Sequence, residues 1–126
     1  VKLEGKTGTS TAGIVFHAKN YAASSHDSYT SMQGYYLALN NNQIVLERLN
    51  YVDDSKNIAT MVQNNPFATS DQFIPLKIQV RGNRIVVWSG ETKLIDVTDS
   101  RAFVNGKIGL STNGAAAVFR NLKVSA

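Results

Sequence analysis

Hydrophobic residues fall in short runs that are separated by turns rich in Gly, Asn and Asp. Within residues 11–19, Ile14 and Phe16 alternate with Val15 and His17, so the two sets are expected on opposite faces of a strand. No stretch carries a sustained apolar period of 3.6 residues, and we expect no long helix. The pattern predicts strands that are joined by short turns.

The same reading applied to the whole chain predicts about ten strands. They cover residues 1–4, 11–19, 34–40, 43–51, 56–63, 73–81, 84–89, 92–97, 107–111 and 116–124. Tight turns at Asn41–Asn42, Gly82–Asn83 and Asn113–Gly114 join neighbours, because Asn and Gly tolerate positive φ. Many short strands without helices indicate an all-β fold, an antiparallel two-sheet jelly-roll sandwich.

Residues 20–33 interrupt this regular spacing with an irregular segment rich in Ala, Ser and Tyr. A loop longer than about 12 residues in a compact domain is usually functional. We therefore expect this segment to contribute to a site or to move.

Composition places the chain among single globular domains, which we expect to span residues 1–126. It has 126 residues, of which 43% are hydrophobic and 17% charged. The absence of Cys excludes disulfides, thiolate metal sites and thiol chemistry, and two His leave little for a His-rich metal centre. The net charge is +4, but the 13 basic residues are dispersed along the sequence, which favours a solvated surface over a nucleic-acid footprint.

Catalytic motifs are missing from the sequence. No Ser lies in a Gly-x-Ser-x-Gly elbow, and the Glu-x-Asp-x-x-Glu pattern of sandwich glucanases does not occur. Glycosidases need two carboxylates about 5 to 9.5 Å apart across a cleft. The nearest pair, Asp96 and Asp99, lies at a strand end and a turn, where a structural calcium ion is a possible occupant. We expect binding rather than hydrolysis.

Sugar recognition needs an aromatic plane beside charged hydrogen-bonding groups, and the second to fourth strands supply such a set. If Phe16 faces the core, alternation puts His17 on the other face, together with Tyr36 of the next strand. Glu47 and Arg48 are consecutive on the return strand, so only one of them shares that face unless a bulge intervenes. Their apolar neighbours favour a specific site, and the sequence leaves open which of the two faces the ligand.

Two further aromatic residues lie at strand ends. Tyr51 ends the strand of Glu47, where its phenol would meet solvent and could join the sugar site. Trp88 precedes Ser89–Gly90 and is compatible with a core position, an outer surface or a sugar platform. We place Tyr51 among the candidate binding residues and keep Trp88 as the alternative location.

Four segments, TAGIVFHAKN, GYYLALNNNQIVLERL, IPLKIQVRGNRIVVWSGETKLIDVTDS and NGKIGLSTNGAAAVFRNLKV, resemble the concanavalin A-like lectin/glucanase sandwich. More narrowly they are similar to carbohydrate-binding module family 66, the fructan-binding modules of secreted bacterial glycoside hydrolases such as exo-levanases. The resemblance covers nearly the whole chain. It implies a module without cofactor or catalysis that binds terminal fructose units of levan and targets an attached hydrolase to chain ends.

The resemblance also implies a secreted, monomeric module with no membrane or nucleic-acid partner. Its binding residues would be His17, Tyr36, Glu47 or Arg48, and Tyr51. Because such modules carry sequence before the first strand, we expect residues 1–4 to be a trimmed strand. The alternatives are the same fold binding another glycan, or a protein as laminin G-like domains do, and an enzyme or enzyme fragment.

Overall fold

A computed structural model describes residues 1–4, 11–19, 33–50, 56–61, 65–68, 72–100, 102–103, 106–113 and 116–124. This part of the chain forms ten strands and one 3₁₀ turn, which confirms the all-β prediction. The elements are β1 (Lys2–Glu4), β2 (Thr11–Lys19), β3 (Gln33–Leu39), β4 (Ile44–Asn50), β5 (Lys56–Met61), η1 (Pro66–Ala68), β6 (Lys77–Arg81), β7 (Arg84–Ser89), β8 (Thr92–Thr98), β9 (Lys107–Asn113) and β10 (Ala116–Val118). Among the described residues, no helix has the length and apolar character needed to cross a membrane.

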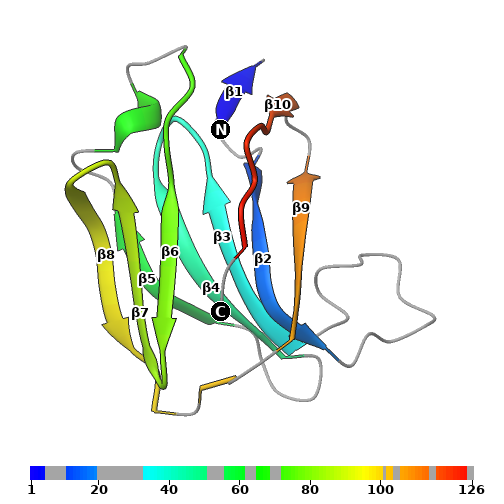
Figure 1. Cartoon of the computed structure of the whole chain (residues 1–126), viewed down its shortest axis with the longest axis vertical. Helices are drawn as coiled ribbons and strands as arrows, with labels where there is room; N and C mark the ends of the chain where they lie inside the picture. Colours follow the sequence, from blue (N-terminus) through cyan, green and yellow to red (C-terminus); the bar gives the residue numbers. More distant parts are fainter. Residues whose placement is uncertain are drawn as a thin grey trace.

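The strands form two antiparallel layers that lie face to face (Figure 1). One layer is a five-stranded sheet in the order β5-β4-β3-β2-β9, and the other is the three-stranded sheet β6-β7-β8. A third, short pair joins β1 to β10. Val1 and Ile74 exchange backbone hydrogen bonds of 2.7 and 2.8 Å, which tie the start of the chain to the segment before β6. The predicted antiparallel sandwich is confirmed.

The main core lies between the two sheets. Phe16, Leu37 and Leu46 enter it from the five-stranded sheet, and Ile85 and Val87 enter it from the three-stranded sheet. These side chains are at most 4% exposed. Burying each of them stabilises the fold by about 1.5–3 kcal/mol. The alternate residues of each strand therefore point away from this core.

The outer face of the five-stranded sheet is also buried. A second apolar cluster lies there, and its members are Val15, Ala18, Tyr36, Ala38, Val45 and Leu49. Every described residue of β3 after Gln33 is consequently buried. A sheet that is buried on both faces produces near-continuous apolar runs rather than a clean alternation of apolar and polar residues. Tyr36 lies on the face opposite the main core, as alternation predicts, but it is only 2% exposed because this outer face is buried as well.

A bulge at His17 changes the direction of the end of β2. His17 has a φ of 50°, in the left-handed region, and the pairing of β2 with both β3 and β9 shifts register around it. Gly34 and Gly106 flank the bulge, and a Cβ atom on Gly106 would overlap the backbone of His17 and Ala18. Alternation predicted His17 on the outer face, and this prediction is wrong because the bulge breaks the alternation.

Two strands, β6 and β10, are more than two residues shorter than expected. β6 begins at Lys77 rather than at residue 73, since Pro75 has no N–H to donate to a sheet ladder. β10 ends at Val118 rather than at residue 124. Asn121 has a φ of 57°, a conformation that cannot continue a strand. The tight turn at Asn41–Asn42 is confirmed, with the Asn40 side chain accepting hydrogen bonds from the backbone N–H groups of Asn42 and Gln43.

Candidate functional site

Glu47 is a half-buried carboxylate on the outer face of the five-stranded sheet. On β4 it lies between Val45 and Leu49, which belong to the outer apolar cluster, and in the β3–β4 ladder it stands opposite Tyr36. No hydrogen bond or ion pair joins its carboxylate to another residue that the structure describes. Burial raises the pKa of Glu47 above its ordinary value. A partly buried charge without a partner costs stability, which marks Glu47 as a candidate binding or catalytic group.

The Tyr36 side chain lies beside Glu47 in the outer apolar cluster. Its ring lies over Gly13, where a Cβ atom would overlap the ring. Its hydroxyl lies 3.1 Å from Thr11 Oγ1, a hydrogen bond that fixes the direction of the side chain along β2. The ring is only 2% exposed and its hydroxyl is already engaged, so Tyr36 packs beneath the surface beside Glu47. Glu47 lies beside this ring and has no hydrogen-bond or ion-pair partner among the described residues.

Arg48, the next residue along β4, points to the opposite side of the sheet. It is 4% exposed, its Nε lies 3.2 Å from Asp99 Oδ2, and its guanidinium carbon lies 4.3 Å from the centre of the Phe103 ring. The Tyr35 hydroxyl donates to the same Asp99 oxygen across 2.6 Å and accepts from the Phe103 N–H at 3.1 Å. Burial raises the pKa of Tyr35 above its ordinary value, and the hydrogen bond to Asp99 adds to this. These groups form a hydrogen-bonded cluster between the sheets.

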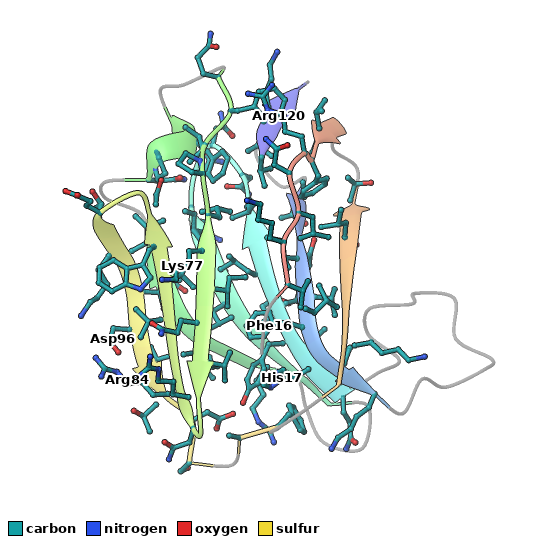
Figure 2. The ribbon with its side chains drawn as sticks, in the orientation of Figure 1. Phe16, His17, Lys77, Arg84, Asp96 and Arg120 are labelled. Carbon is teal, nitrogen blue, oxygen red and sulfur yellow. The ribbon has the colours of Figure 1, made fainter. Side chains whose placement is uncertain are left out.

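His17 is half-buried and borders the cluster of Arg48 through Phe103. Its Nδ1 lies 2.8 Å from the Phe103 carbonyl oxygen, a contact in which Nδ1 must carry the proton because the carbonyl only accepts. The His17 ring is 6.0 Å from the Phe16 ring and 6.4 Å from the Tyr35 ring, and Figure 2 shows His17 beside Phe16 at the lower end of the sandwich. The bulge thus turns His17 toward the space between the sheets.

The candidate residues therefore do not converge on one site. Glu47 and Tyr36 share the outer face of the five-stranded sheet, while His17 and Arg48 lie with Asp99 between the sheets. Of the two consecutive charged residues on β4, Glu47 lies beside Tyr36, whereas Arg48 points to the other side of the sheet. Tyr51 and residues 20–32, which include most of the irregular segment, lie outside the described residues.

Tyr35 and Asp99 hold the buried cluster together, and the sequence patterns do not indicate this role for either residue. The sequence predicts Asp99, at the end of a strand, as a possible calcium ligand. Its carboxylate instead accepts from Tyr35 and Arg48. The signal available in the sequence was Arg48 within an apolar strand, together with Asp99 at the end of another strand far along the chain.

The carboxylates that suggested calcium form ion pairs. Asp96 accepts hydrogen bonds of 2.8 and 2.6 Å from Arg84 and 3.0 Å from Lys93. The Arg84 guanidinium and the Lys93 ammonium hold the pKa of Asp96 well below its ordinary value. Within the described residues, no group of three or more His, Cys, Asp or Glu side chains could hold a metal ion. The structural calcium ion stays a prediction.

Comparison with known proteins gives one match. A protein-family model described as "3-keto-alpha-glucoside-1,2-lyase-like domain" matches residues 1–125, which is nearly the entire chain. Its members have a concanavalin A-like, glucanase-type fold, in agreement with the two-sheet sandwich. Neither the curated proteins nor the solved structures contain a match to the chain.

Proposed function

We propose a function for this chain from its family and from the outer face of its five-stranded sheet. The chain belongs to the 3-keto-alpha-glucoside-1,2-lyase-like domains, a carbohydrate-related, lectin/glucanase-like family. The proposed function is recognition of the terminal sugar unit of a polysaccharide, with terminal fructose of levan as the ligand. The module would be a secreted monomer without cofactor, linked to a glycoside hydrolase that it targets to chain ends. Fructose is favoured by the resemblance of the chain to carbohydrate-binding module family 66.

The observation that carries the proposal is the Glu47 carboxylate. An ionised carboxylate without a protein partner can accept two hydrogen bonds from neighbouring sugar hydroxyls. Tyr36, Val45 and Leu49 lie beside it but are at most 4% exposed, so the contact with the sugar would be made by the carboxylate itself. A single carboxylate beside apolar side chains is suited to holding one sugar unit. Among the described residues, no second carboxylate of the kind that glycoside hydrolysis requires is placed beside it.

Such a site binds weakly, and avidity would increase its effect. One sugar unit held by a few hydrogen bonds typically gives a Kd on the order of millimolar to micromolar, or about −4 to −8 kcal/mol. Covalent linkage to a hydrolase raises the effective concentration of the enzyme near a branched polymer with many ends. The proposed benefit is therefore localisation rather than tight capture.

Isothermal titration calorimetry with fructose, levan, inulin, xylan and β-glucan tests the proposal. We expect heat with fructose and levan, and affinity at least about tenfold weaker in Glu47→Gln because the amide lacks the charge. Glu91→Gln is the matched control, since Glu91 is an exposed carboxylate on the β7–β8 turn. Heat with xylan or β-glucan alone would refute fructan recognition, and unchanged levan binding in Glu47→Gln would refute the site.

The second candidate is a lyase that uses the same carboxylate as a base. The family description names a 1,2-lyase acting on 3-keto-alpha-glucosides, and burial raises the pKa of Glu47, which strengthens it as a base. In such an elimination the ketone at C3 acidifies the C2–H bond. Glu47 would take this proton, the C2–H electron pair would form the C1=C2 double bond, and the C1–O bond would break to release the alcohol.

Incubation with methyl 3-keto-α-glucoside separates the two candidates. The binding module leaves this compound intact, whereas the lyase releases methanol and forms an enone that absorbs ultraviolet light. Release that requires Glu47, together with no calorimetric heat from levan, would assign the chain to the lyases. Heat from levan without release of methanol would assign it to the binding modules.

A further inference from the structure

The outer face of the three-stranded sheet gathers basic residues that are dispersed in the sequence. On β6, Ile78 and Val80 pack against the core, so Lys77 and Arg81 lie on the opposite face. In the ladder with β7, Lys77 pairs with Trp88 and Arg81 pairs with Arg84. The next strand brings Lys93 opposite Trp88. Antiparallel strand pairing thus brings onto one surface basic residues that are separated from one another in the sequence.

We call this surface the cationic face, and its principal residues are Lys77, Arg81, Arg84, Trp88, Lys93 and Asp96. It carries four cations against one carboxylate, and Glu91 lies on the turn at its end. Figure 2 labels Lys77 on β6 and shows Arg84 and Asp96 on the same sheet. A surface with this excess of one sign attracts ligands of the opposite sign.

The cations of this face are available to a ligand to different degrees. Asp96 engages Arg84 and Lys93, whose side chains are 57% and 42% exposed. Lys77 and Arg81 are exposed, and no described carboxylate forms an ion pair with either of them. Asp96 thus tethers two cations beside the aromatic ring. Along β6, Lys77 and Arg81 have no carboxylate partner among the described residues, although the Gln79 side-chain oxygen accepts hydrogen bonds from the Arg81 guanidinium.

Trp88 adds an aromatic surface in the middle of these charges. It is half-buried, and the Lys93 ammonium lies 5.4 Å from the centre of its ring. An indole face packs against the C–H surface of a sugar ring, and neighbouring ammonium and guanidinium groups bind carboxylates attached to that ring. The combination of one aromatic ring with surrounding cations matches a sugar that carries a negative charge.

We propose that the cationic face binds an acidic polysaccharide built of uronic acid units. This site is separate from the outer face of the five-stranded sheet and takes a ligand of different charge. Among polyanions, a nucleic acid is less well matched, because single-stranded nucleic-acid sites stack successive bases on several aromatic side chains. Trp88 is the single Trp of the chain, and it is the aromatic residue of the cationic face.

Titration with polygalacturonate, followed by tryptophan emission, tests the proposal directly, since all tryptophan emission comes from Trp88. We expect a saturable change that is lost in high salt, because exposed charges are screened. The double variant Lys77→Gln/Arg81→Gln should bind about fivefold more weakly, as expected for the loss of two exposed ionic contacts. Lys19→Gln/Lys107→Gln removes the same charge from the five-stranded sheet and should bind like the wild type.

Asp96→Asn is expected to change affinity in the opposite direction. Removing this carboxylate releases Arg84 and Lys93 for the polymer, so polygalacturonate should bind about twofold more tightly at low salt. A double variant on β6 that binds like the wild type would overturn the proposal, as would an emission that polygalacturonate leaves unchanged. Tighter binding of single-stranded oligo(dT) than of polygalacturonate would assign the face to nucleic acid and would also overturn it.

Discussion

The Tyr35 hydroxyl donates a hydrogen bond of 2.6 Å to the carboxylate of Asp99, and this contact joins the two sheets at one end of the sandwich. Tyr35 lies on β3 of the five-stranded sheet, and Asp99 directly follows β8 of the three-stranded sheet. Arg48 and the Phe103 N–H complete the hydrogen bonding of the pair. The buried cluster is therefore a connection between layers, and its loss should lower stability.

Tyr35→Phe removes the hydroxyl and keeps the ring. A hydrogen bond to a charged group contributes about 1.5–3 kcal/mol, so we expect the free energy of unfolding to fall by about 2 kcal/mol. Tyr36→Phe is the matched control, because its hydroxyl bonds the neutral Thr11 and should contribute about 1 kcal/mol. Urea unfolding of both variants measures the difference. Equal losses in the two variants would show that the hydrogen bond from Tyr35 to Asp99 is no stronger than the one between Tyr36 and Thr11.

Arg48→Ala should destabilise the protein strongly. The change leaves the Asp99 carboxylate buried without its cation, which typically costs about 3–5 kcal/mol. Arg84→Ala removes an exposed partner of Asp96 and should cost about 1 kcal/mol or less. Thermal and urea unfolding compare the two variants. An Arg48→Ala protein of wild-type stability that had lost sugar binding would instead place Arg48 in the ligand site.

Gly106→Ala tests the bulge at His17. A methyl group at this position overlaps the backbone of His17 and Ala18, and the φ of 149° is unfavourable for Ala, so we expect a loss of about 3 kcal/mol or more. Gly109→Ala, two residues after the start of β9, meets no atom within 4 Å and should be nearly neutral. Circular dichroism melting curves report both changes. A neutral Gly106→Ala would mean that the bulge is free to rearrange.

The raised pKa of Glu47 predicts opposite pH dependences for stability and for binding. Below its ordinary value of 4.5 the group is neutral in both the folded and unfolded chain. As the pH rises through the native pKa, the unfolded chain releases the proton more readily, so stability falls relative to Glu47→Gln. Levan affinity should rise over the same interval, because the carboxylate form accepts the sugar hydroxyls. Urea unfolding and calorimetry at matched pH values test both slopes, and parallel slopes would contradict the assignment.

The sandwich could be predicted from the sequence because hairpin turns and strand lengths are local properties. The bounds of β2 and β7 agree with the residues expected from the apolar runs. The positions of individual side chains depended on strict alternation, which holds for Glu47 and Arg48. It fails at His17, where a residue with positive φ interrupts the strand. Bulges depend on packing against Gly34 and Gly106, which are distant in sequence.

The candidate site could be predicted only in part for a related reason. Glu47 stands out in the sequence as a charge among apolar residues, and the structure leaves it without a partner among the described residues. Arg48 has the same sequence signature, but its partner Asp99 is 51 residues away. Nothing local distinguishes a charge that is paired across the core from one that is free. The gathering of basic residues on the cationic face likewise depends on strand pairing.

Glu47 and Arg48 are consecutive on β4 but point to opposite faces of the sheet, so different evolutionary constraints act on the two positions. A substitution of Glu47 changes the charge of the outer face and leaves the ionic connection between layers intact. Substitutions on the side of Arg48 are removed by selection for folding, whatever the ligand. Because Val45 and Leu49 on either side of Glu47 are themselves buried, Glu47 is the position on this side of β4 that can change while the packing of the sandwich persists.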